Sequence, residues 1–117
     1  MLFPPLPSPR PPARVVVTGA GLVTALGAGW RSNAEGFRAG RAAFRPVTLF
    51  DVSRQRARLA AEVDLPSTLP DTRLSDRTRN RLDRATQMLL LAAHAAWTQA
   101  GWEPGDPLPL VLGTTSG

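Results

Sequence analysis

Hydrophobic residues form two short unbroken runs, one near each end of the chain. Residues 15–18 read Val-Val-Val-Thr and are all β-branched, and Leu110–Gly113 is a second apolar run that ends at a glycine. Short continuous apolar runs followed by glycine favour strands that are buried on both faces. We therefore expect one strand over 15–18 and another over 110–113, each with neighbours on both edges.

A first helix is predicted from Trp30 to Ala39. Trp30, Ala34 and Phe37 fall at i, i+4 and i+7 and would share one face against a core. Gly40 supplies a helix stop, because glycine adopts the left-handed conformation without a steric penalty.

The longest helical pattern runs from Leu82 to Ala100, where nearly every residue is apolar or a strong helix former. Apolar residues surround most of its circumference, which is typical of a helix buried within a larger protein. Ser75 or Asp76 can cap a helix start by accepting a bond from a free backbone amide. Gly101 suits the position after the last turn, and Trp102 can fold back onto that turn.

The segment between these helices has no clear period. Pro46 excludes a continuous helix, Arg58–Val63 favours a short and partly exposed strand, and Pro66 and Pro70 close that strand off into a loop. Two or three short strands and two helices make about half of an α/β domain, because buried strands need more neighbours than this chain provides.

The first thirteen residues contain six prolines and predict a disordered, polyproline-like tail, so that the organised part is residues 14–117. This tail lacks the basic start and apolar run of a secretory signal. No segment approaches the roughly 20 apolar residues that span a bilayer. A soluble cytoplasmic protein is the default expectation.

The 117 residues include no cysteine, which excludes disulfides, thiolate metal sites and a cysteine nucleophile within this chain. The net charge of +5 comes from fourteen basic residues that are all arginine and are spread along the chain. Their densest group, residues 73–84, is interrupted by Asp76 and Asp83 and contains no aromatic residue on which a base could stack. Nucleic-acid binding is therefore disfavoured.

Two candidate sites are rejected. Gly19 and Gly21 begin a dinucleotide-type glycine pattern, but Thr24 occupies the third glycine position and no acidic residue follows at the ribose-binding distance. His94, the only histidine, is assigned to a polar stripe on the long helix together with Asp83, Gln87 and Thr98. A triad or metal site needs partners that this chain does not show, so we expect no catalytic residue, metal or cofactor here.

Six features in one order and spacing, over residues 14–117, resemble the β-ketoacyl-acyl-carrier-protein synthases of the thiolase-fold superfamily. In chain order they are Arg14–Thr24 with Leu26-Gly27, Trp30–Ala43, Pro46 with Phe50-Asp51, Ala60 with Glu62 and Val63, Leu82–Arg84 with Gln87 and Ala100-Gly101, and Val111–Gly117.

The resemblance implies the N-terminal part of an α/β/α layered fold, incomplete in this chain, in an enzyme that assembles as a homodimer. It implies decarboxylative condensation of acyl and malonyl thioesters carried by acyl carrier protein, in fatty acid or polyketide synthesis. That chemistry uses a cysteine nucleophile and two histidines, which lie beyond Gly117 in the family's layout. The chain alone is then expected to be inactive.

Thr115 and Ser116 are the substrate-binding candidates. The resemblance places their loop beside the acyl-binding cavity, with Ser116 at a position whose side-chain size gates acyl entry. The alternative is that both are ordinary turn residues after a strand. Two other functions stay open, namely a non-catalytic homologue such as a chain-length factor and a free-standing binding module.

Overall fold

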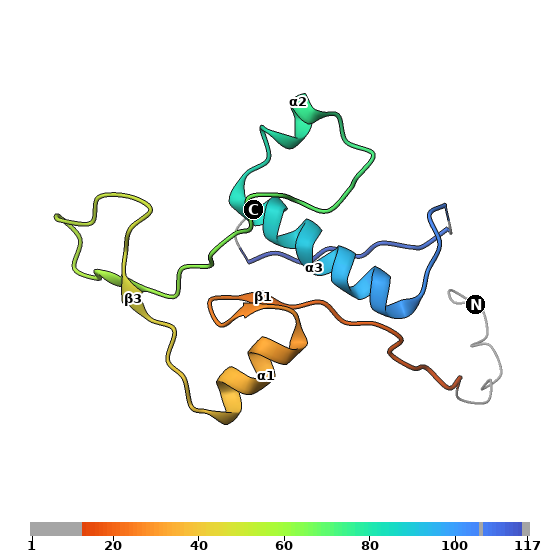
Figure 1. Ribbon diagram of the computed structural model, residues 1–117, viewed down its shortest axis with the longest axis horizontal. Helices are drawn as coiled ribbons and strands as arrows, with labels where there is room; N and C mark the ends of the chain where they lie inside the picture. Colours follow the sequence, from red (N-terminus) through yellow and green to blue (C-terminus); the bar gives the residue numbers. More distant parts are fainter. Residues whose placement is uncertain (1–12, 106, 116–117) are drawn as a thin grey trace, which may run out of the picture.

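The computed structural model describes residues 13–105 and 107–115, in which short strands and helices are joined by long loops (Figure 1). The elements are β1 (Val23–Thr24), β2 (Gly27–Ala28), α1 (Trp30–Arg38), β3 (Arg45–Pro46), β4 (Leu59–Ala60), α2 (Asp76–Arg79) and α3 (Arg84–Ala100). The predicted mixture of helices and strands is confirmed. The Cα radius of gyration is 19.7 Å, whereas a compact domain of about 100 residues has one near 13 Å. The arrangement is therefore open.

The first half is organised around a tight hairpin and α1. Strands β1 and β2 pair antiparallel, with Thr24 opposite Gly27 across a two-residue turn. Gly27 has a φ of 129°, which an L side chain rarely adopts. Helix α1 begins at Trp30 as predicted, and Gly40 follows it in the left-handed region with a φ of 60°.

The face of α1 that points inward differs from the predicted one. Trp30 and Phe37 are largely exposed, whereas Asn33 and Gly36 are buried. The side chain of Leu26 packs against Gly36. A Cβ at Gly36 would lie only 3.0 Å from a Leu26 methyl carbon, so a larger residue would crowd this contact. The hairpin therefore packs on the small and polar side of the helix, and the periodicity of large apolar residues identified the wrong face.

Strands β3 and β4 form a second antiparallel pair, with Arg45 opposite Ala60 and Pro46 opposite Leu59. In Figure 1 this pair lies apart from α1 and α3, toward the left of the view. Of the strand predicted over Arg58–Val63, only Leu59–Ala60 is confirmed.

The helix start predicted at Ser75 or Asp76 is confirmed, but it belongs to a short helix that is separate from the long one. Ser75 caps the single turn α2 by accepting the Thr78 amide, and the long helix α3 starts later, where the Asp83 carboxylate accepts the Thr86 amide. The predicted end of α3 is confirmed. Gly101 has a φ of 69°, and the Trp102 ring folds back to 6.1 Å from the Trp97 ring.

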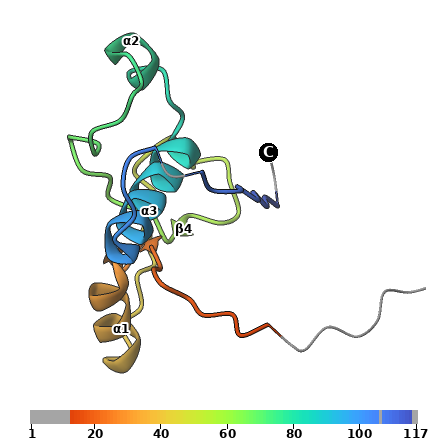
Figure 2. The same cartoon turned by 90° about the vertical axis from the view of Figure 1, so that its right-hand side faces the viewer.

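The strands predicted over 15–18 and 110–113 are absent from the structure. Val15, Val16 and Val17 are 88%, 75% and 86% exposed, and Leu110, Val111 and Leu112 are 86%, 94% and 61% exposed. Both segments lie outside the two sheets (Figure 2). A strand exists only when its amides and carbonyls pair with a neighbour, and the described residues supply no such neighbour to either segment.

No hydrophobic side chain is fully buried within residues 13–105 and 107–115. Helix α3 was expected to be buried, yet none of its residues is. Across the same part of the chain, no helix has the length and apolar character needed to cross a membrane.

Candidate functional site

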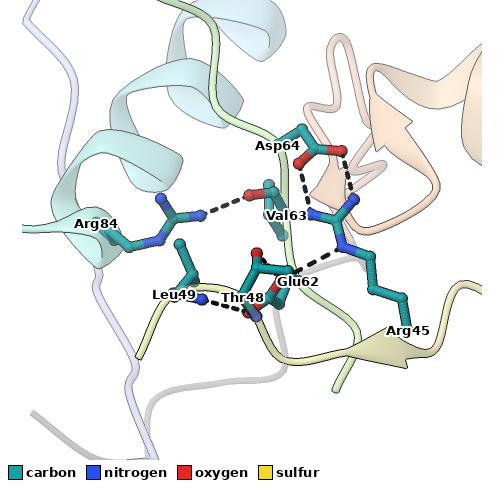
Figure 3. Close-up of polar contacts among 7 residues, drawn as sticks. All are labelled: Arg45, Thr48, Leu49, Glu62, Val63, Asp64 and Arg84. Carbon is teal, nitrogen blue, oxygen red and sulfur yellow. Dashed lines mark hydrogen bonds and ion pairs between the residues drawn. The ribbon is translucent and has the colours of Figure 1, made fainter. Parts of the chain in front are cut away.

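A cluster of polar contacts is centred on Glu62, just after β4 (Figure 3). Its side chain is only 3% exposed. One carboxylate oxygen, Oε1, accepts the backbone amides of Thr48 at 2.8 Å and Leu49 at 3.1 Å. The other, Oε2, accepts the Thr48 hydroxyl at 2.9 Å and Arg45 Nε at 3.3 Å. Glu62 therefore ties the segment after β3 to the segment after β4.

Two arginines extend this cluster. Arg45 directs its two terminal nitrogens at the two oxygens of Asp64, in a paired arrangement that adds geometric specificity. Arg84, at the start of α3, donates to the Val63 carbonyl between the two acidic residues. The cluster thus also connects the β3–β4 pair to α3.

These contacts leave Glu62 no role in proton transfer. The Thr48 amide contributes most to lowering the pKa of Glu62 below the ordinary 4.5, helped by the Thr48 hydroxyl, the Leu49 amide and Arg45, while desolvation opposes them. The paired Arg45 likewise lowers the pKa of Asp64. A carboxylate that is ionised at neutral pH and already accepts four hydrogen bonds is a structural clamp, not an acid or a base.

A pH dependence follows from this clamp. Because the folded-state pKa of Glu62 is lowered, its stabilising contribution is present above 4.5 and is lost as pH falls through the folded-state value. We expect the urea midpoint of the full-length gene product to fall with pH below 4.5, and to fall less steeply in Glu62→Gln. Equal acid slopes for the two proteins would contradict this role of Glu62.

A second buried polar residue, Asn33, was not anticipated. It is 1% exposed. Its amide nitrogen donates to the Gly27 carbonyl at 3.0 Å and the Gly29 carbonyl at 2.7 Å, and its amide oxygen accepts the Thr24 hydroxyl. Gly29 provides no side-chain cap for α1, and Asn33 instead donates to the carbonyls of two residues that precede the helix. It fixes the β1–β2 hairpin to α1.

Asn33→Ala is expected to destabilise the full-length gene product by about 1–3 kcal/mol, because buried partners of the lost amide remain unsatisfied. Denaturant unfolding measures this change. Glu35→Ala on the exposed side of α1 is the control, for which we expect little change. A similar loss in both variants would show that Asn33 has no special role.

His94 is exposed and borders two hollows beside α3, one lined also by Trp30 and Gln99 and the other by Trp97 and Arg73. Of the four residues predicted to form a polar stripe on this helix, Gln87, His94 and Thr98 lie within α3, whereas Asp83 precedes it. The Asp83 carboxylate caps α3, and the side-chain amide of Gln87 donates a hydrogen bond to the Leu82 carbonyl. In the part of the chain that the structure describes, no group of three or more acidic, histidine or cysteine residues could hold a metal ion.

The two residues predicted to bind substrate lie at the end of the chain. Thr115 is exposed, and Ser116 falls outside the described residues. Their predicted role therefore stays a prediction. Asn33 and Glu62 are not residues that react. The sequence signals for Glu62 were its position as an acidic residue within an apolar run and its place in the family resemblance, and neither indicated a buried role. Asn33 lay between residues assigned to a core face.

Comparison with known proteins identifies the family. Residues 13–117 match the family model of the β-ketoacyl synthase N-terminal domain. The chain belongs to the β-ketoacyl synthase family. The matched range includes Asn33, Glu62 and the whole of α3.

The relatives of this β-ketoacyl synthase segment are named for two kinds of synthesis. It is 36% identical over 104 residues to the ketoacyl synthase alpha subunit of the tetracenomycin polyketide synthase of Streptomyces glaucescens, covering 89% of this chain and 24% of that protein. It is 33% identical over 91 residues to 3-oxoacyl-[acyl-carrier-protein] synthase 2 of Coxiella burnetii, covering 77% of this chain and 21% of that protein. The chain thus spans about a quarter of the length of these relatives. No solved structure matches it.

Proposed function

We propose that this chain is the N-terminal part of a condensing enzyme that joins acyl and malonyl thioesters with loss of carbon dioxide. The observation that carries the proposal is the family match over residues 13–117, together with relatives named as ketoacyl and 3-oxoacyl synthases. The absence of cysteine agrees with a nucleophile that lies elsewhere in the whole enzyme.

In the proposed reaction, an acyl group is transferred from its carrier thioester to a cysteine thiolate. Malonyl thioester then loses carbon dioxide, and the carbanion left behind attacks the acyl carbonyl and releases the thiolate. This segment contributes scaffold rather than reacting groups. We further propose that the whole protein has the thiolase-like α/β/α fold, works as a homodimer in the cytoplasm and takes its substrates from acyl carrier protein.

An assay of the full-length gene product with acyl-loaded and malonyl-loaded carrier protein tests this proposal. We expect release of carbon dioxide together with a 3-oxoacyl product, and covalent acylation that is lost when the nucleophilic cysteine is replaced by alanine. Absence of both acylation and condensation in a folded protein would overturn the proposal.

A non-catalytic chain-length factor is the alternative, and the same assay separates the two. Such a protein would lack the acylated cysteine and would change only the length of the product made by a partner. Comparing the products made with carrier proteins of fatty acid synthesis and of polyketide synthesis would also distinguish the two pathways.

For the terminal loop, we propose that Thr115 and Ser116 lie beside the entrance for the acyl chain. Replacing Ser116 by phenylalanine is then expected to lower kcat/KM for long acyl substrates more than for acetyl substrates, because a larger side chain narrows the entrance. Kinetics with a series of acyl lengths measure this effect. If long and short substrates lose activity equally, these residues only form a turn.

A further inference from the structure

The donors around Glu62 are arranged like an anion-binding site. Two consecutive backbone amides, from Thr48 and Leu49, converge on Oε1 at 2.8 and 3.1 Å. The Thr48 hydroxyl and Arg45 Nε converge on Oε2 at 2.9 and 3.3 Å (Figure 3). Successive backbone amides that converge on one anion are a common anion-binding element, and we call this one a nest. Here the bound anion is the carboxylate of Glu62, from the same chain.

The charge around this nest favours a carboxylate over a phosphate. The remaining arms of Arg45 are occupied by Asp64, whose side chain is 81% exposed. The positive charge of Arg45 is therefore shared with a second carboxylate, which leaves little attraction for a dianion. The donors are also divided between two oxygens, two to each, as a planar carboxylate requires.

We propose that Arg45, Thr48 and Leu49 form a carboxylate-binding nest in which Glu62 is the built-in ligand, and that a small carboxylate from solution takes its place when the side chain is removed. Glu62 is then a positioning residue that fixes the segment after β3 against β4. This inference does not depend on the condensing activity proposed above, because it concerns the folding of one loop and is measured without substrate.

The test is chemical rescue of Glu62→Ala in the full-length gene product. This substitution removes the carboxylate and the adjoining methylene, and acetate supplies a methyl group and a carboxylate in their place. We expect the variant to have a lower thermal midpoint than the wild type. Sodium acetate should raise it with the logarithm of concentration, recovering about half or more of the loss. Sodium chloride at equal ionic strength and the neutral analogue acetamide should not raise the midpoint of the variant. Acetate should not change the midpoint of the wild type.

Asp64→Ala is the matched control, since it removes another carboxylate from the same arginine at an exposed position. Acetate should not rescue it. The proposal is overturned if acetate does no more than chloride for Glu62→Ala, or if it rescues Asp64→Ala equally. Stronger rescue by phosphate than by acetate would overturn the carboxylate preference. If Glu62→Ala is recovered only as insoluble protein, its refolding yield in acetate against chloride gives the same two outcomes.

Discussion

Replacing Gly21 by alanine is expected to destabilise the full-length gene product by about 1–3 kcal/mol or more, as overpacking does elsewhere. A Cβ on Gly21 would overlap the backbone carbonyl of Ala92 in α3. That carbonyl belongs to a helix and cannot rotate aside as a flexible side chain would. The segment before β1 would therefore have to move away from α3.

The same argument applies to Gly19, whose Cβ would overlap the Ala96 carbonyl. Two residues of extended chain advance about 6–7 Å, and the four residues from Ala92 to Ala96 rise about 6 Å along a helix. Alternate glycines therefore meet successive turns of α3. Ala20, between them, donates its amide to the Gln99 side chain at 2.8 Å and fixes this register.

Gly113→Ala is the control for Gly21→Ala, because a Cβ there meets no atom within 4 Å and its backbone is not in the left-handed region. Urea unfolding of the three proteins compares them. We expect Gly113→Ala to match the wild type while Gly21→Ala falls well below it. Equal midpoints for both variants would show that the contact with α3 does not constrain Gly21.

The second large effect concerns the 117 residues on their own. We expect the isolated chain to show no sharp thermal transition, and to bind hydrophobic dyes strongly. No apolar side chain is fully buried in the described residues, and the segments around Val16 and Val111 expose consecutive apolar residues. Cooperative unfolding requires a shared core that this part of the chain does not form.

Circular dichroism during heating, with dye fluorescence at low temperature, measures this behaviour, and the full-length gene product is the positive control. A monomeric 117-residue chain with a sharp transition and little dye binding would support a free-standing binding module instead.

Features set by neighbouring residues could be predicted from the sequence. The two main helices and the left-handed glycines that end them depend on caps and side chains within a few positions, and Gly40 and Gly101 were placed correctly. The strand around Leu59 was predicted from its own residues, whereas its partner strand, Arg45–Pro46, was not predicted.

Features set by distant residues could not be predicted in the same way. The apolar run at 15–18 has strand propensity, but whether it pairs depends on a partner elsewhere. Gly19 and Gly21 were considered as the start of a dinucleotide-type pattern, whereas in the structure they lie against the backbone of α3, far along the chain. Glu62 is buried because it accepts backbone amides of the segment after β3, and the residues around Glu62 do not indicate those partners. Asn33 bonds to nearby residues, but only the folded hairpin brings their carbonyls to its side chain.

The chain's place in a condensing enzyme is tested most directly by reading the coding sequence downstream of the Gly117 codon. We predict that it continues in frame to a glycine-flanked cysteine and then to two separated histidines, the groups that condensation requires. A stop codon directly after Gly117, or an in-frame continuation with the cysteine replaced, would contradict a catalytic role for the protein.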